Sequence, residues 1–214
     1  FHFIPIFASI GGFSLEEYDE SHLKIEPHSE GVELCIRCPN IYNKEMIFTN
    51  PENLSKLLSR ISTHHAKPLF VRILSYDTEK ERENRLDLID ACIRNRVDAL
   101  AISGAVKIED KRVSVGYANL TGQAILPNTL RIVQDIYNAT DGKIDIKASG
   151  GIFSARDALE VIKAGATTVD IYTALVYEGW GLIKNLNLGL VGLLREQGYS
   201  SIEEARGTLR AIPA

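Results

Sequence analysis

The fold is decided by one stretch, Lys147-Ala148-Ser149-Gly150-Gly151-Ile152-Phe153-Ser154. It continues a short strand that is predicted to begin at Ile144, and Ser154 is a residue type that caps helix N-termini. Apolar residues at helical spacing then predict a helix from Ala155 to about Ala164. The stretch is therefore a strand, a glycine turn and a helix in direct succession.

The two glycines make this turn a candidate anion cradle. Without a Cβ, Gly150 and Gly151 let main-chain N–H groups approach a ligand, and the helix N-terminus adds partial positive charge. Such an arrangement most often holds phosphate. The next expected strand ends in Tyr172 and Thr173, whose hydroxyls could donate to the same anion. A tight turn without a ligand is the alternative interpretation.

Outward from this stretch, strands and helices alternate along the whole chain, which predicts a parallel sheet with helices outside it. Polar or glycine-containing strand ends recur, which favours a barrel over a doubly wound sheet. We predict an α/β fold, a TIM-barrel-like parallel (β/α) barrel that is incomplete, with six strand–helix units in a single domain over residues 1–214. The strands are expected at Ile4–Ser9, Glu33–Cys38, Leu69–Leu74, Ala99–Ser103, Ile144–Ala148 and Thr168–Thr173.

The helices and the open edge follow from the same pattern. An excursion strand is expected at Arg112–Tyr117. Six strands cannot close an eight-stranded barrel, so strands supplied elsewhere in an assembly or a protein partner are expected at the open barrel edge. Further helices are expected from Pro51, and over Thr78–Arg96, Pro127–Ala139, Glu178–Gln197 and Ser201–Arg206.

Composition limits the classes of function. The chain has 214 residues, is 45% hydrophobic and carries a formal net charge of −4, so it can form a full core and gives no reason to expect nucleic acid as a partner. No apolar run reaches the ~18 residues of a membrane span. The first residue is Phe1 rather than Met, which predicts either a removed leader or a fragment.

The three cysteines argue for a reducing compartment without a disulfide framework. Cys35 and Cys38 have CxxC spacing, so a redox or zinc site is an alternative. On a strand, however, residues three apart point to opposite faces, and no second CxxC or histidine pair completes a zinc set. We expect no metal site.

Four segments share one family pattern: Ala148–Ser154, Asp157–Glu160, Ala164–Ala166 and Tyr172–Gly179. They resemble dihydroorotate dehydrogenases, closest to the quinone-dependent, mitochondrial-type class, and the likeness is specific from about Leu120 to Gly207. The resemblance implies an eight-stranded α/β barrel that holds FMN and oxidises dihydroorotate to orotate in pyrimidine biosynthesis. It also implies a mitochondrial location, with a cytoplasmic location as the alternative.

The same resemblance assigns roles to individual residues. Cys38, before Pro39, takes the place of the catalytic base, and Asn40 that of a substrate-binding residue. Arg72 stands where a lysine near the flavin ring is expected. The FMN phosphate is expected at Gly150, Gly151, Tyr172 and Thr173, together with Thr121 and Gly122.

Several positions depart from the family pattern. Arg37 and Cys35 replace a serine and an asparagine, Gly104-Ala105 replaces an Asn-Thr pair, and the first two strands are absent. Arg37 is expected to point into the barrel mouth and fill space that FMN or orotate needs. We therefore expect a catalytically degenerate family member, a structural or accessory subunit of a larger assembly that could retain FMN. The alternatives are an active FMN-dependent enzyme and a binding module for a phosphorylated ligand.

Overall fold

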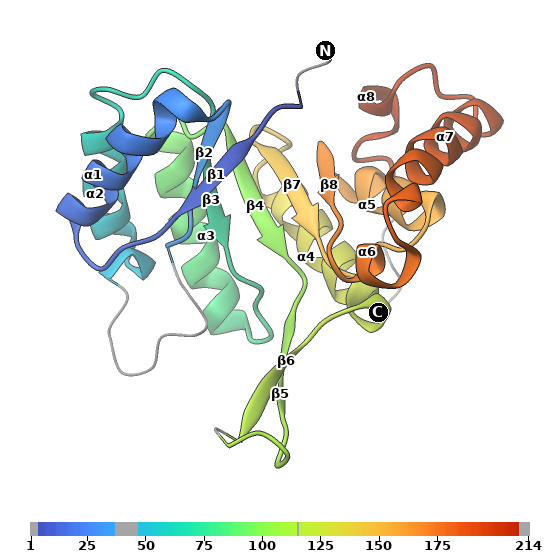
Figure 1. Ribbon diagram of the computed structural model, residues 1–214, viewed down its shortest axis with the longest axis horizontal. Helices are drawn as coiled ribbons and strands as arrows, with labels where there is room; N and C mark the ends of the chain where they lie inside the picture. Colours follow the sequence, from blue (N-terminus) through green and yellow to red (C-terminus); the bar gives the residue numbers. More distant parts are fainter. Residues whose placement is uncertain (1–3, 37–46, 115, 210–214) are drawn as a thin grey trace. The chain divides into compact units, whose positions relative to one another are not determined.

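The computed structural model describes residues 4–36, 47–114 and 116–209 (Figure 1). Contacts divide the chain into two compact units, Phe1–Ala101 and Ile102–Ala214, and each is described by itself. The expectation of one domain over residues 1–214 stays a prediction.

Unit 1 alternates strands and helices. Strands β1, β2 and β3 are parallel neighbours, with Ala8 opposite Val32 and Val32 opposite Leu69. The elements are β1 (Phe7–Ile10), α1 (Leu15–Ile25), η1 (Glu26–His28), β2 (Gly31–Leu34), η2 (Ile47–Thr49), α2 (Pro51–Ile61), β3 (Leu69–Ile73), α3 (Glu79–Arg94) and the first part of β4 (Ala99–Ser103), a strand that continues into unit 2.

Capping residues set the start of the helices in unit 1. The side chain of Asn50 accepts hydrogen bonds from the first turn of α2, so this helix begins at Pro51 as expected. Thr78 and Glu81 form a capping box that begins α3. The sequence prediction missed α1, because only Tyr18, Asp19 and His22 of that helix are buried and its apolar periodicity is weak.

Strand pairing moved two predicted boundaries. β1 begins at Phe7 because its ladder starts opposite Gly31, while Ile4 and Ile6 are exposed. β2 ends at Leu34, so the predicted strand over Glu33–Cys38 is too late, and residues 37 and 38 lie outside the described residues.

Unit 2 holds a hairpin and the glycine loop. The hairpin pairs Val106–Glu109 with Tyr117–Leu120 in antiparallel register. The predicted excursion strand over Arg112–Tyr117 is therefore wrong: it falls mostly on the turn between β5 and β6. The elements are β5 (Val106–Glu109), β6 (Tyr117–Leu120), η3 (Gln123–Ile125), α4 (Leu126–Ala139), β7 (Asp145–Ser149), α5 (Ala155–Ala164), β8 (Thr168–Asp170), α6 (Thr173–Glu178), α7 (Gly181–Glu196) and α8 (Ile202–Ala205).

A glycine divides the long helix that was expected over Glu178–Gln197. Gly179 has a φ of 69°, in the left-handed region, so α6 ends there and α7 begins at Gly181. The preceding strand β8 ends at Asp170, earlier than expected, because Tyr172 already caps α6.

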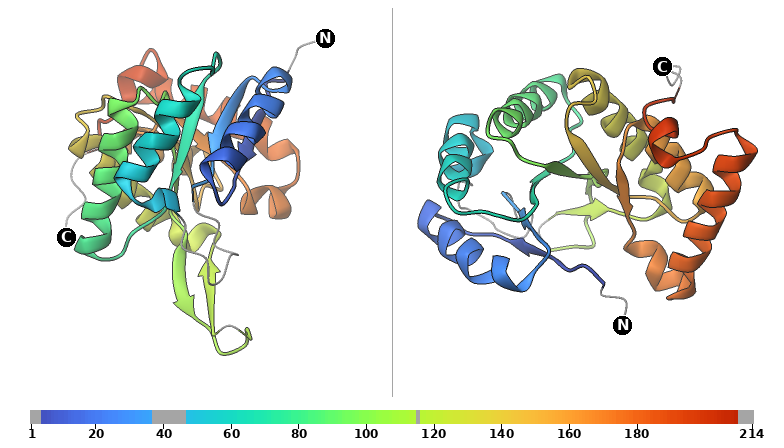
Figure 2. Two further views of the ribbon diagram at one scale, coloured as in Figure 1. Left: turned by 90° about the vertical axis from the view of Figure 1, so that its left-hand side faces the viewer. Right: turned by 90° about the horizontal axis from the view of Figure 1, so that it is seen from above.

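The hydrogen-bonded order of the six main strands is β1-β2-β3-β4-β7-β8, so all six predicted strands exist in the expected sequence. β1 and β8 are the two end strands. In each unit the helices lie outside the strands (Figure 2). Among the described residues, no helix combines the length and apolar character needed to cross a bilayer.

Candidate functional site

The helix after the glycine pair satisfies its own N-terminus. Ser154 caps α5, and the Oδ2 atom of Asp157 accepts hydrogen bonds from the main-chain N–H of Phe153 at 3.0 Å and of Ser154 at 2.8 Å. The carboxylate therefore takes the donors that an anion would use and adds its own negative charge. An anion site therefore has to lie before the capping box of Ser154 and Asp157, at the two glycines that follow the strand.

The glycine pair is required first by packing. Gly150 and Gly151 have φ values of 121° and 79°, a region that L side chains rarely adopt. A Cβ on Gly151 would lie 2.4 Å from the main-chain nitrogen of Leu126, and one on Gly150 would lie 2.8 Å from Oγ1 of Thr129. The glycines thus let the loop rest directly on the start of α4.

Thr129 is the residue that organises this loop. It is fully buried on α4, and its hydroxyl lies 2.9 Å from the carbonyl oxygen of Gly150. A Cβ on Gly104 would lie 1.9 Å from the same hydroxyl, so Gly104 and Thr129 fit together only as a pair. The sequence prediction missed Thr129, although a polar residue on the apolar face of a predicted helix is a readable signal.

The loop that leads into α4 joins the other predicted phosphate residues. Gly122 has a φ of 88°, and a Cβ on it would lie 3.6 Å from the Cγ2 atom of Thr173. Segment 121–126, which includes η3 and the first residue of α4 and is called loop 121–126 below, therefore lies against Gly151 at one end and beside Thr173 at the other. Five of the six residues predicted to hold phosphate are thus gathered at this loop. They are Thr121 and Gly122 within it, and Gly150, Gly151 and Thr173 beside it.

This cluster offers free main-chain donors. Among the hydrogen bonds between described residues, none is donated by the main-chain N–H of Gly150, Gly151 or Thr173. Tyr172, by contrast, is 83% exposed. The arrangement fits the phosphate end of a nucleotide cofactor, which main-chain N–H groups can hold without a side-chain cation.

Arg72, the residue expected near the flavin ring, lies in unit 1 and has a carboxylate partner. Its Nε and Nη2 atoms lie 2.8 and 2.6 Å from Oε1 of Glu33, and Ser9 donates to the same oxygen at 2.9 Å. Glu33 is buried, whereas a third of the Arg72 side chain is exposed. Opposite charges inside two neighbouring apolar strands, VEL and FVR, were the sequence signal for this pair.

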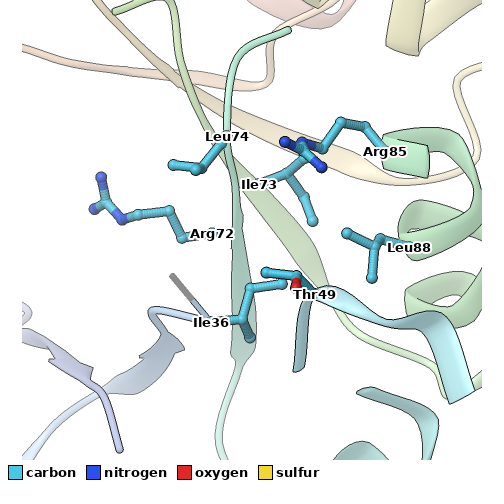
Figure 3. Close-up of a pocket in the computed structure, with 7 residues that line it drawn as sticks. All are labelled: Ile36, Thr49, Arg72, Ile73, Leu74, Arg85 and Leu88. Atoms are coloured by element: carbon cyan, nitrogen blue, oxygen red, sulfur yellow. The ribbon is translucent and has the colours of Figure 1, made fainter. Parts of the chain in front are cut away.

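Arg72 also lines a small pocket on β3. Figure 3 shows Arg72 on one side of this strand and Arg85, from α3, on the other, so the two guanidinium groups do not converge on one ligand. The other lining residues are Ile36, Thr49, Ile73, Leu74 and Leu88.

The expected catalytic residues lie outside the described residues: Cys38, Asn40 and Arg37 all fall in segment 37–46. Cys35 is partly buried, and burial raises the pKa of Cys92 to about 12, so that thiol stays protonated. Within the described ranges, no group of three or more His, Cys, Asp or Glu side chains could hold a metal ion.

Comparison with known proteins identifies the relatives of this chain. The family described as dihydroorotate dehydrogenase matches residues 1–194. The fumarate-type dihydroorotate dehydrogenase of Kluyveromyces lactis is 30% identical over 97% of this chain and 69% of its own length. The NAD(+)-type catalytic subunit of Geotalea daltonii is 30% identical over 96% of this chain and 68% of its own length.

A solved structure supports the fold. The ligand-free dihydroorotate dehydrogenase of Eimeria tenella superposes with a TM-score of 0.78 at 20% identity, covering 91% of this chain and 60% of that one. The TIM-barrel-like fold class is thereby confirmed. The curated relatives are of the fumarate and NAD(+) types, so the expected closeness to the quinone-dependent class is wrong. The mitochondrial location stays a prediction.

Proposed function

Because the chain belongs to the dihydroorotate dehydrogenase family, we propose that it binds FMN by its phosphate and takes part in oxidising dihydroorotate to orotate. FMN, when bound, supplies the acceptor for the hydride that leaves the substrate. Gly150, Gly151 and Thr173 would hold the phosphate through their main-chain N–H groups, with Gly122 leaving room beside them.

One observation carries this proposal: the main-chain N–H groups of Gly150, Gly151 and Thr173, which follow two separate strands, donate no hydrogen bond to another described residue, and these residues lie beside segment 121–126. A turn that served packing alone would need the glycines at 150 and 151. Gly122 is needed for its φ of 88° in any case, but its Cβ position is open apart from one ordinary contact with Thr173, unlike those of Gly150 and Gly151. The space beside Gly122 is what an anion would occupy.

The remaining chemistry would come from side chains. Cys38, directly before Pro39 and Asn40, would accept the proton from dihydroorotate once its pKa is lowered. We propose a water-soluble acceptor such as fumarate or NAD(+) for the second half of the reaction. The types of the curated relatives support this choice.

A second candidate is the accessory role, in which the family fold serves without turnover. Two observations favour it. The guanidinium of Arg72 is engaged by Glu33, and a side chain at position 104 is excluded by Thr129. The cation expected near the flavin ring is thus already paired, and the Asn-Thr pair that would grip a planar, charged substrate is missing at Gly104-Ala105. Leaving such a substrate without hydrogen bonds costs on the order of several kcal/mol.

The two candidates are separated by measuring cofactor binding and turnover independently. FMN binding to the purified chain is followed by flavin absorbance and by quenching of flavin fluorescence. Dihydroorotate-dependent reduction of fumarate or NAD(+) is measured on the protein isolated from its source. We expect both, and we expect Cys38→Ala to abolish turnover while FMN stays bound, with Cys35→Ala as the matched control.

The other outcomes are equally informative. Bound FMN without turnover in the isolated protein would favour the accessory role. Binding of inorganic phosphate without any flavin would favour a binding module for a phosphorylated ligand. Loss of FMN binding on Cys38→Ala would contradict the proposal, in which the glycine cluster binds FMN and Cys38 serves only as the base.

A further inference from the structure

Strand β7 carries a charged side chain that the proposed phosphate site does not use. Residues alternate between the two faces of this strand, so Ile146 and Ala148, which are fully buried, lie on one face and Lys147 and Ser149 on the other. The Lys147 side chain is only 19% exposed. An ammonium group in such a position needs a partner, and its partner indicates what this face of the strand can bind.

The partner of Lys147 is Asp170 on the neighbouring strand β8 (Figure 1). The Nζ atom of Lys147 lies 3.3 Å from Oδ2 of Asp170, although the residue directly opposite Lys147 in the ladder is Thr168. Asp170 is opposite Ser149 instead, so the lysine side chain extends diagonally towards the carboxyl ends of the two strands. The ion pair therefore lies at the level of Ser149, one residue before Gly150.

Both strands lead from this ion pair directly into the proposed phosphate site. Gly150 follows the ladder position of the pair on β7, and Thr173 follows Asp170 by three residues. One strand residue spans about 3.3 Å, so the pair lies within roughly 10 Å of the main-chain N–H groups proposed to hold phosphate. A ligand whose phosphate is held there, and which extends along this face, has its next group beside the pair.

Packing leaves this face as the direction in which such a ligand extends. On the other side, the loop of Gly150 and Gly151 rests on Leu126 and Thr129 of α4. Helices α4 and α5 pack against β7 and β8, so they cover the face of the fully buried strand residues. The face of Lys147 is therefore the one that stays open to a ligand.

The group that follows the phosphate in FMN is the ribityl chain, a row of hydroxyl groups. A hydroxyl both donates and accepts hydrogen bonds, so it matches an ammonium group that donates and a carboxylate that accepts. We propose that Lys147 and Asp170 bind the ribityl hydroxyls of FMN and thereby position the cofactor. This inference rests on the proposed function, and it adds a side-chain subsite to the main-chain phosphate site.

A purely structural role accounts for the pair less well. The Asp170 side chain is 44% exposed, and an ion pair that reaches solvent contributes little to stability. Between described residues, no hydrogen bond is donated to Oδ1 of Asp170. Lys147 thus orients the carboxylate and leaves it an acceptor atom. Hydrogen bonds between a hydroxyl and a charged group are stronger than those between neutral groups, so this atom is well suited to a ribityl hydroxyl.

The charge of Asp170 provides a way to test the proposal. A carboxylate near a bound phosphate repels it, and Lys147 offsets that repulsion. If Asp170 acted only through its charge, removing it would strengthen the binding of every phosphorylated ligand. If Asp170 accepts a hydrogen bond from the ribityl chain, removing it weakens FMN binding while the binding of inorganic phosphate does not weaken.

The experiment measures the binding of three probes to the full chain. FMN and riboflavin are titrated by flavin fluorescence, and inorganic phosphate is measured by its competition with FMN. We expect Lys147→Met and Asp170→Ala each to weaken FMN binding about tenfold, as the loss of one charge-assisted hydrogen bond predicts. Riboflavin has the ribityl chain without the phosphate, so Asp170→Ala should weaken its binding by a similar factor. Inorganic phosphate should bind at least as tightly to Asp170→Ala as to the unaltered chain.

Two further variants make the test specific. Lys143→Met is the matched control, because Lys143 forms an ion pair with Asp141 before β7 begins, and it should leave FMN affinity unchanged. Asp170→Asn keeps one acceptor oxygen, so it should retain part of the affinity that Asp170→Ala loses. It also replaces Asp170→Ala if urea unfolding shows that this variant does not fold.

Two results would overturn the inference. The first is FMN affinity that stays unchanged or rises in Asp170→Ala, which would leave the pair a charge or structural role. The second is equal weakening of lumiflavin, a flavin without the ribityl chain, which would place the contact at the flavin ring. If the unaltered chain binds no FMN, the proposed function fails together with this inference. If all variants bind FMN as the unaltered chain does, this inference alone fails.

Discussion

The two units place their polar groups differently. Unit 1 buries side chains that carry or can carry charge, whereas the buried polar side chains of unit 2 are two threonines, as far as the described residues show. The candidate site of unit 2 consists of main-chain N–H groups. The charged residues of unit 1 in question are Asp19, His22, Glu33 and Arg85.

This difference teaches which parts of a family site tolerate change. A main-chain site depends on positions where a Cβ is forbidden, and packing enforces those glycines whether or not a ligand binds. A side-chain site depends on partners that can be exchanged together, as the pair Arg72 and Glu33 illustrates. The first kind of site therefore keeps its pattern while the second kind diverges.

The packing requirement for glycine in unit 2 is tested most directly at Gly151. We expect Gly151→Ala to destabilise the protein by roughly 3–5 kcal/mol, because the new Cβ would lie 2.4 Å from the main chain of Leu126 at a φ of 79°. Urea unfolding measures the loss. Gly192→Ala is the control, since Gly192 has open space within α7 and alanine there should stabilise by about 0.5–1 kcal/mol. Equal stability of the two variants would contradict the packing account.

Disrupting the Arg72–Glu33 pair of unit 1 should cause a smaller loss of stability than Gly151→Ala. Arg72→Met leaves Glu33 buried without its cation, and we expect a destabilisation of about 2–3 kcal/mol, moderated because part of Arg72 reaches solvent. The double variant Arg72→Met, Glu33→Leu should recover most of the loss, because it also removes the uncompensated charge. No recovery in urea unfolding would mean that the two residues stabilise the protein independently.

Sequence reasoning predicted the parts of the fold that depend on local chemistry. The glycine stretch, the Ser154 cap and the apolar faces of α2 and α5 can be read from residue type and spacing, and the structure has them. Strand ends were less predictable, because β1 and β2 are bounded by their ladder partners rather than by their own apolar content. The excursion strand was misplaced because the turn residues of the hairpin also alternate.

The site was predictable where it depends on glycine and not where it depends on distant partners. Gly122 and Thr173, 51 positions apart, were grouped by family resemblance, and the structure brings them together. Thr129 was missed although a polar residue on the apolar face of a predicted helix can be read from the sequence, because that pattern does not show its contacts with Gly104 and Gly150. The ion pair of Arg72 and Glu33 was missed although each charge stands inside an apolar strand, because neither stretch alone shows that the two strands are neighbours.

A third prediction sharpens the ligand side of the comparison. Gly122→Ala places a methyl group beside Thr173 without a clash, so we expect a stability loss of about 1 kcal/mol from the backbone alone. FMN affinity should fall about tenfold, or ~1.4 kcal/mol, if the space holds phosphate. Gly179→Ala is matched in φ and open space but lies outside loop 121–126, so it should leave the affinity unchanged. Fluorescence titration with FMN compares the two variants.

The smallest expected effect is a dependence of the stability of unit 1 on pH. Burial lowers the pKa of His22, and the nearby Glu26 only partly opposes this effect. His64 has its ring centroid 5.2 Å from that of His22, and its Nε2 atom lies 2.6 Å from the carboxylate of Asp19. His65 also acts unfavourably on the charged form of His22. The imidazole of His22 is therefore held in its neutral form where α1 packs against α2.

The sign of the effect follows from proton linkage. Because the pKa of His22 is lower in the folded state than its unfolded value near 6.5, the unfolded state binds more protons as the pH falls below that value. Stability is complete above about pH 7 and should drop by under ~1 kcal/mol towards about pH 5.5. The carboxylates of Asp19 and Glu26 stay charged in this window, since hydrogen bonds outweigh burial and lower both pKa values.

Hydrogen exchange should show this loss of stability in α1 and α2, and not around Thr129. His22→Gln should remove the dependence, while His28→Gln, on an exposed position, should keep it. A loss that appears equally in unit 2, which buries no charged group among its described residues, would mean that the two units do not differ in the way their polar groups are held.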